Sequence, residues 1–326
     1  MSAALRSARH TVGYWGLRGL LGAARALPPS LLVALGRAGG RLASLSMGRE
    51  SRRAFEHLEA AFPDRDRRWR ARLAAACASH LGTLLGEVAW LWSASADDIL
   101  ARTEFVGLEH LTGACDAGGG AVFVTAHCGN WEWMNLALGA AGVPMTVAAR
   151  EVYDPRLDVL VQRLRGRFGG QTVLRGQGAG QRLARALRGG RVVGLLIDQD
   201  IDAPGVFVEF FGRPAWTPSG AALLALRTRR PCVPGFAARK PNGVMQLCFD
   251  AALELAGGGA LEDQVGALTA RLSARIEKQV RSNPEQWVWM HRRWRRQPGA
   301  GEKVWRAGPA GAVPAGGGET AAAVSG

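Results

Sequence analysis

The feature that most constrains this chain is a strand-to-helix junction at residues 121–138, AVFVTAHCGNWEWMNLAL. The apolar run 121–124 is typical of a buried parallel strand, and the spacing of apolar residues from Trp131 onward favours a helix. Open α/β sheets place their chemistry at such turns, outside the carboxyl ends of the strands. The polar residues between the strand and the helix are therefore the first candidates for a functional site.

Two ionisable residues stand at this junction, His127 and, five positions later, Glu132. Asn130 is predicted to cap the helix, which places Glu132 in the first turn, where the helix dipole favours an ionised carboxylate. The loop can bend back over the helix start and bring the imidazole to this carboxylate. A carboxylate on one ring nitrogen fixes the tautomer and leaves the other nitrogen free as a base. We therefore predict that His127 is a general base oriented by Glu132.

Other interpretations of the junction stay open. His127 and Glu132 could form an ordinary hydrogen-bonded pair at a helix start. Cys128 suggests a Cys–His nucleophile, but adjacent side chains on an extended chain point in opposite directions, which disfavours this chemistry. Backbone amides near Gly129 and Asn130 are candidates for stabilising an oxyanion.

The H-x4-E arrangement within T-A-H-C-G-N-W-E resembles the bacterial lipid A late acyltransferases, the lauroyl and myristoyl transferases. These belong to the wider H-x4-D/E group of lysophospholipid acyltransferases. Three more blocks of the chain resemble the same family in the same order: VQRLRGRFGG at 161–170, DQD with VFVEFFGRPAWTPSG at 198–220, and NPEQWVWMHRRWRRQP at 283–298. The resemblance covers most of residues 105–298.

The resemblance carries two further site residues onto this chain. A functionally important arginine of the family falls on Arg167, although Arg163 and Arg165 are close. A basic side chain here could bind the phosphate or sugar acid of an anionic lipid, and a solvated basic helix face is the alternative. Asp198 is expected to order a basic partner such as Arg167. The apolar run Val206–Phe211 could line a groove for an acyl chain or belong to the core.

The acidic residues after the predicted strand at 191–197 also invite a metal-binding interpretation. Asp198, Asp200, Asp202 and Glu209 superficially match a calcium loop of the EF-hand type. Ala203 stands where that loop requires glycine, and a strand precedes it in place of a helix. We therefore predict no metal site.

The resemblance implies an α/β fold, a mixed central sheet flanked by helices. The family usually has a membrane-spanning helix at the N-terminus, and this chain departs from that pattern, so its N-terminal helices are expected to be membrane-associated. It implies transfer of a fatty acyl chain from an acyl thioester to a hydroxyl of a lipid A precursor, without a cofactor. The donor is expected to be acyl carrier protein, with acyl-CoA as the alternative. Another glycolipid or a lysophospholipid is the alternative acceptor. The expected location is the cytoplasmic face of the bacterial inner membrane.

Composition adds limits on partners and compartment. The formal net charge is +14, which suits an anionic partner such as a membrane, an acidic protein or nucleic acid. The 5 cysteines form no C-x-x-C pair, which argues for a reducing compartment without structural zinc or a disulfide framework. Trp287, Trp289 and Trp294 among arginines could stack on single-stranded RNA or form a membrane-interface belt. The resemblance favours the belt and no nucleic-acid partner, so a basic membrane- or RNA-binding protein is the non-enzyme alternative.

Three regions are predicted along the chain. Residues 1–47 are expected to form basic amphipathic helices that lie on the membrane, since the uncharged run 26–36 is too short to span it. A signal peptide and an ordinary pair of packing helices are the alternatives. Residues 48–298 form the predicted acyltransferase domain, and residues 299–326 a disordered tail of Gly, Ala and Pro.

Overall fold

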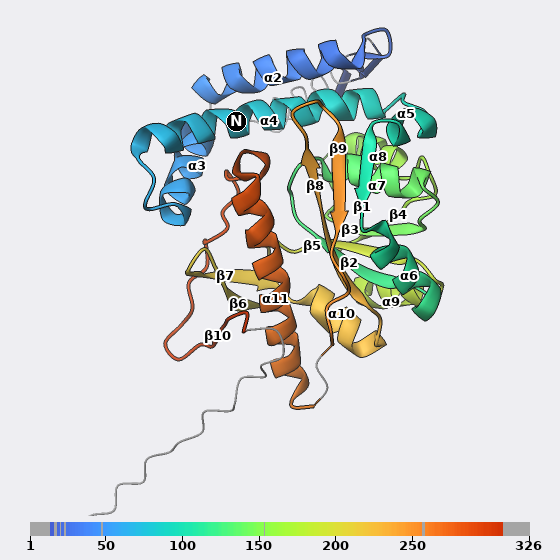
Figure 1. Ribbon diagram of the computed structural model, residues 1–326, viewed down its shortest axis with the longest axis vertical. Helices are drawn as coiled ribbons and strands as arrows, with labels where there is room; N and C mark the ends of the chain where they lie inside the picture. Colours follow the sequence, from blue (N-terminus) through green and yellow to red (C-terminus); the bar gives the residue numbers. More distant parts are fainter. Residues whose placement is uncertain are drawn as a thin grey trace, which may run out of the picture.

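A mixed sheet with helices on both faces forms the centre of the computed structural model (Figure 1). The structure describes residues 14–15, 18–19, 21–22, 24–46, 48–152, 154–255 and 258–308. The strands of this sheet are β1 Thr103–Val106, β2 Ala121–Thr125, β3 Met145–Ala149, β4 Gln171–Leu174, β5 Val192–Leu196, β8 Cys232–Arg239 and β9 Met245–Phe249. They lie in the order β1-β9-β8-β2-β5-β3-β4, and β8–β9 is the antiparallel pair. This confirms the predicted mixed α/β sheet.

Helices cover both faces of the large sheet, so its central strands are buried on both sides. Helices within the described residues include α2 Pro29–Ser46, α3 Gly48–Ala61, α4 Arg67–Leu91, α5 Ala96–Leu100, α6 Leu108–Gly118, α7 Trp131–Ala140, α8 Pro155–Arg165, α9 Ala179–Arg188, α10 Gly220–Thr228 and α11 Leu261–Ser282. Alternate residues of β2 enter two different cores. Val122 and Val124 pack with α9, α10 and α11, whereas Ala121 and Phe123 pack with α6, α7 and α8. Strand β2 therefore lies at the middle of the protein.

Helix α4 lies across the carboxyl ends of β2 and β8 (Figure 1). Asp66 caps its first turn by accepting a hydrogen bond from the backbone N–H of Trp69 at 2.6 Å. His80 of α4 contacts the turn after β2, and Glu87 of α4 pairs with Arg239 at the end of β8. The helix thus forms one wall beside the edge of the sheet where chemistry is expected.

Helix α2 packs against α4 through glycines. A Cβ atom at Gly36 or Gly40 would collide with the backbone of α4, so only glycine permits this approach. The opposite face of α2 exposes leucines to solvent. The part of residues 1–47 that the structure describes therefore contains a helix packed on the α/β domain. Among the described residues, no helix has the length and apolar character needed to cross a membrane.

A second, smaller sheet contains β10 Val304–Trp305, β6 Gly205–Phe210 and β7 Arg213–Pro218. Strand β10 pairs in parallel with β6, and Trp305 is buried against Gly266 of α11. The expectation of a disordered tail from residue 299 is therefore wrong for residues 304–305, because Trp305 packs with Val208 of β6 and Ala270 of α11. Residues 309–326 of the predicted tail lie outside the described residues.

Candidate active site

His127 and Asp198 meet at the carboxyl ends of the neighbouring parallel strands β2 and β5. Nδ1 of His127 lies 2.8 Å from Oδ1 of Asp198, and the backbone N–H of His127 donates to Oδ2 at 2.9 Å. The indole N–H of Trp287 donates to the same Oδ2 at 2.8 Å. Because two N–H groups fix Oδ2, Oδ1 is directed at the imidazole.

The electrostatics favour an ionised Asp198. Burial by itself would raise the pKa of this carboxyl group, which is 1% exposed. The charge on His127, together with hydrogen bonds from His127 and Trp287, outweighs burial and lowers the pKa to about 2. The ionised carboxylate can only accept a hydrogen bond, so Nδ1 of His127 is the donor and Nε2 of the neutral imidazole carries the free lone pair. His127 is partly exposed, at 21% of its side chain, and can meet a substrate.

The structure corrects the predicted partner of His127. The carboxylate of Glu132 forms a two-point ion pair with the guanidinium of Arg165, in which Nε of Arg165 lies 2.9 Å from Oε2. Asn130 caps α7 as predicted, its side chain accepting from the backbone N–H of Trp133 at 3.0 Å. The position of Glu132 in the first turn is therefore confirmed, but its side chain turns toward α8. Asp198 occupies Nδ1 of His127 instead.

Arg167 also differs from its prediction as a partner of Asp198. Its guanidinium donates to the backbone carbonyls of Leu91 and Ala94, the latter at 2.7 Å. These carbonyls belong to the end of α4 and the connection that follows it, where backbone acceptors lack partners within the helix. Arg167 therefore joins the end of α8 to the end of α4.

The turn that carries His127 depends on a glycine. Gly129 has φ +57°, and a Cβ atom there would collide with the carbonyl oxygen of Ala237 on β8. The backbone N–H of Gly129 donates to the carbonyl of Gln286 at 2.9 Å, and its carbonyl accepts from Nε2 of His80 at 3.1 Å. The amide of Gly129 is therefore already used, which corrects its candidacy as an oxyanion donor.

A buried ion pair supports this turn from the side of α4. Arg239 forms a two-point contact with Glu87 and donates to Nδ1 of His80 at 2.8 Å. Glu87 also accepts from the side-chain amide of Asn130 at 2.9 Å. Burial and the charge of Arg239 lower the pKa of His80 to about 3, so His80 is neutral and its Nε2–H donates to Gly129. Each buried polar group of this network has a partner.

Cys128 does not have the environment of a nucleophile. It is buried, and burial together with the charge of Asp198 raises the pKa of its thiol well above the ordinary value. A reactive cysteine needs the opposite shift. This observation agrees with the expectation that disfavoured a Cys–His pair.

The tryptophans of the C-terminal block are buried or half-buried, which corrects their interpretation as a belt at the membrane interface or an RNA-stacking surface. Trp287 and Trp289 are each 1% exposed, and Trp294 is half-buried. Arg293 is 1% exposed and donates to the carbonyl of Trp216 and to Oγ1 of Thr217. The tryptophans are therefore core residues, and one of them holds the carboxylate that orients His127.

The acidic residues that follow Asp198 in and after the DQD segment pair with arginines of the C-terminal block. Asp200 is buried, accepts from the backbone N–H of Arg296 at 2.9 Å and pairs with Arg295 at 3.0 Å. Asp202 is exposed and lies 3.3 Å from the guanidinium of Arg296. Among the described residues, no cluster of His, Cys, Asp and Glu is arranged to hold a metal ion. Phe210, in the apolar run that follows, belongs to the core.

Sequence reasoning did not assign Trp287, Arg165 or His291 to this site, and it did not foresee the supporting network of His80, Glu87 and Arg239. Trp287 and His291 lie in the PEQWVWMHRR block, whose aromatic and basic character is plain in the sequence, but their approach to Asp198 spans 89 residues or more. His291 is close enough for the charges of Asp198 and His127 to act on it, and burial lowers its pKa to about 4. The signal available for Arg165 was its position two residues before the predicted Arg167.

Comparison with known proteins supplies the wider context. A sequence profile described as bacterial lipid A biosynthesis acyltransferase matches residues 2–296. A lipid A biosynthesis lauroyltransferase of Escherichia coli K12 is 28% identical over 308 residues, covering 91% of this chain and 95% of the relative. A lipid A biosynthesis palmitoleoyltransferase of the same organism is 27% identical over 296 residues, covering 89% and 93%. A phosphatidylinositol mannoside acyltransferase of Mycobacterium tuberculosis is 30% identical over 194 residues, covering 58% of each chain.

Proposed function

The chain belongs to the bacterial lipid A biosynthesis acyltransferase family and is an acyltransferase, and from its site we propose that His127 is the general base of the transfer. The acyl chain would pass from an acyl thioester to a hydroxyl group of a lipid A precursor. The observation that carries this proposal is the contact of Nδ1 of His127 with the buried carboxylate of Asp198. This contact leaves Nε2 of a partly exposed imidazole as the basic atom.

The reaction follows from that geometry. Nε2 of His127 takes the proton of the acceptor hydroxyl as the oxygen attacks the thioester carbonyl, forming a tetrahedral oxyanion. Asp198 stabilises the imidazolium, as in other carboxylate–histidine pairs. The oxyanion collapses and the C–S bond breaks, which releases the thiolate. The imidazolium of His127 returns its proton to this thiolate, so the products are the new ester and a free thiol. A thiolate is a good leaving group, so the transfer needs neither a strong acid nor a cofactor.

Glu132 has a positioning role in this proposal. Its ion pair with Arg165 joins the first turn of α7 to the end of α8, next to the turn that carries His127. Arg167 joins the same end of α8 to the end of α4. These contacts support a role for Glu132 and Arg167 in the walls of the site. There they would hold the shape of the site and would not exchange protons.

The donor and the attachment to the membrane belong to the same proposal. An acidic acyl carrier protein suits a chain with a formal net charge of +14, which would steer it toward the site. The exposed leucines of α2 support attachment to a membrane surface, in keeping with the cytoplasmic face of the bacterial inner membrane. Leu31, Leu35, Leu42 and Leu45 are 41%, 56%, 67% and 83% exposed and lie on one face of the helix.

A second acceptor class is favoured by one comparison. The mycobacterial relative is named a phosphatidylinositol mannoside acyltransferase and is 30% identical over the region it shares with this chain. The same His127–Asp198 pair could deprotonate a hydroxyl of such a mannolipid. The alternative therefore changes the acceptor and leaves the chemistry unaltered.

The experiment is an acyl-transfer assay with purified full-length protein and acyl carrier protein loaded with a saturated fatty acyl chain. A tetra-acylated lipid A precursor is the first acceptor and a phosphatidylinositol mannoside the second. Wild type, His127→Ala and, as a control, His110→Ala are compared, because His110 is an exposed histidine of α6. Product is detected as a mass gain of one acyl group.

We expect product from wild type and His110→Ala and none from His127→Ala. Product on the mannolipid alone would replace the proposed acceptor. Activity of the folded His127→Ala protein equal to that of wild type would contradict the assignment of the base.

A further inference from the structure

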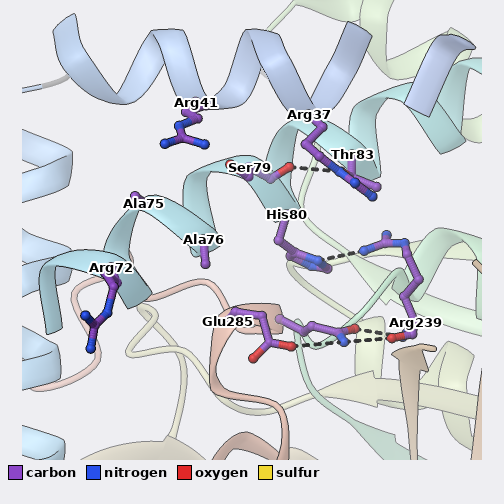
Figure 2. Close-up of a pocket in the computed structure, with 11 residues that line it drawn as sticks. Arg37, Arg41, Arg72, Ala75, Ala76, Ser79, His80, Thr83, Arg239 and Glu285 are labelled. Carbon is purple, nitrogen blue, oxygen red and sulfur yellow. Dashed lines mark hydrogen bonds between the residues drawn. The ribbon is translucent and has the colours of Figure 1, made fainter. Parts of the chain in front are cut away.

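A basic cavity of about 430 Å³ is lined by residues of α2 and α4 (Figure 2). Arg37 and Arg41 extend from α2 toward α4, and Arg72 and Ser79 belong to α4. The 3₁₀ helix η1 Pro284–Gln286 and the end of β8 close the cavity below. A volume of this size suits a small head group and exceeds the space needed for a few waters.

The charge of the cavity is unbalanced. Arg37, Arg41 and Arg72 form no ion pair with any residue that the structure describes. Arg239 also lines the cavity, but its charge is compensated by Glu87. Glu285 is the acid among the lining residues. Three uncompensated guanidinium groups therefore face one carboxylate.

Arg37, Arg41 and Arg72 are exposed, so water solvates them, and none of them has a carboxylate partner among the described residues that a ligand would have to displace. Guanidinium groups bind phosphate through charge-assisted, often two-point hydrogen bonds. The hydroxyl group of Ser79 adds a neutral donor to the wall. The chemistry of the cavity therefore fits a phosphate group.

The surroundings indicate where the phosphate comes from. Arg37 and Arg41 occupy the face of α2 next to its exposed leucine face, which includes Leu42 and Leu45. A helix that lays such leucines into the boundary of a bilayer holds the adjacent arginines at the depth of the lipid head groups. We propose that this cavity binds the phosphate monoester head group of a membrane lipid.

The cavity and the catalytic turn share supporting residues. His80 and Gln286 line the cavity, and both are hydrogen-bonded to the backbone of Gly129. A lipid head group in the cavity would thus rest against the residues that hold the turn carrying His127. The binding proposal stands on the cavity and the leucine face, and it does not depend on which molecule accepts the acyl chain.

The test measures binding of the full chain to phosphatidylcholine vesicles containing phosphatidic acid, whose head group is a phosphate monoester. Ala76 of α4 lines the cavity and is half-buried. Ala76→Glu places a carboxylate among the arginines, and Ala76→Gln is its neutral control of the same size. We expect the glutamate variant to weaken binding by about tenfold and the glutamine variant to change it less than about twofold.

A second pair of variants separates the cavity from the general positive charge. Arg37, Arg41 and Arg72 are changed together to Gln, and Arg49, Arg67 and Arg68 form the control set, since they are exposed arginines of α3 and α4 outside the cavity. Both sets remove the same charge. An equal loss of vesicle binding in the two sets would overturn the proposal, because binding would then reflect non-specific attraction.

Inorganic phosphate and vesicles containing phosphatidylglycerol at matched charge complete the test. Ala76→Glu could weaken the calorimetric binding of free phosphate and yet leave vesicle binding unchanged. That result would overturn the lipid assignment in favour of a soluble phosphate ester. Equal binding of phosphatidylglycerol would overturn recognition of the monoester. Cavity-dependent binding by a wild type that transfers no acyl chain would leave this proposal standing while the proposed function failed.

Discussion

Nδ1 of His127 and Oδ1 of Asp198 lie 2.8 Å apart although 71 residues separate them in the chain. The contact exists because β2 and β5 are parallel neighbours, so the residues that follow them emerge at the same edge of the sheet. Trp287 and the backbone N–H of His127 hold the second carboxylate oxygen. The base of the proposed reaction is thus oriented by a residue from another strand.

Asp198→Asn is expected to lower kcat by about a thousandfold. The amide oxygen of the introduced side chain would accept from Trp287 and from the backbone of His127, which turns its NH₂ group toward Nδ1. The imidazole would then carry its proton on Nε2 and lose its basic atom. Steady-state kinetics of acyl transfer measure the effect, and Asp202→Asn, which changes an exposed acid of the same segment, is the control. Unchanged kcat in the Asp198→Asn variant would show that the contact is dispensable.

Replacing Glu132 tests whether it acts on the base or on the walls of the site. Glu132→Gln and Arg165→Gln should each lower the free energy of unfolding. The double variant should lose less free energy of unfolding than the sum of the two single losses, by a coupling energy of about 1–2 kcal/mol. Denaturant unfolding of the four proteins measures this coupling. A positioning role predicts that the pH profile of kcat/KM in Glu132→Gln keeps the wild-type midpoint of the base. A shifted midpoint would restore the hypothesis that Glu132 orients His127.

Gly129→Ala should destabilise the protein by about 2 kcal/mol or more, because it combines a positive φ with a collision against β8. Gly142→Ala is a matched control, since Gly142 has φ +84° but open space around it. The free energy of unfolding should fall by only about 1 kcal/mol in the Gly142→Ala control. Thermal unfolding compares the two variants. Equal losses would mean that the close approach of Gly129 to Ala237 contributes little.

Acidification should destabilise the protein through His80 and His291. The pKa of His80 is lowered to about 3 and that of His291 to about 4, both from an ordinary 6.5. The unfolded chain therefore binds more protons, and the stabilising contribution of each histidine is present above pH 6.5 and lost as the pH falls toward the folded value. Melting temperatures between about pH 7 and about pH 4.5 should fall less steeply in His291→Gln than in wild type. The exposed His110→Gln serves as the control, and identical slopes in all three proteins would contradict this account.

Leu42→Glu with Leu45→Glu should weaken binding to anionic vesicles by about tenfold or more, because two exposed apolar side chains of α2 become charged. Val159→Glu with Leu261→Glu is the control pair, which changes exposed apolar residues of α8 and α11. Flotation of the full chain with vesicles measures the binding. A loss of the same size in the control pair would show that α2 is not the attached surface.

Local patterns predicted much of the secondary structure. The apolar run of β2 and the start of α7 at its Asn130 cap were predicted from the chain, because burial and capping depend on neighbouring residues. The short strands β4 and β7 were not, since their formation depends on strands distant in sequence. Likewise β10 could not be foreseen in a segment rich in Gly and Pro.

The sequence alone determined that His127 stands at the end of a buried strand with a carboxylate in the first turn of the next helix, and its ordered motifs identified the family. Only the tertiary structure decided which carboxylate meets the imidazole. Glu132 is near in sequence but turns to Arg165, whereas Asp198 is distant and reaches Nδ1 because the sheet brings β5 beside β2. Spacing along a chain sets which contacts are possible, and strand order together with competing charges sets which of them form.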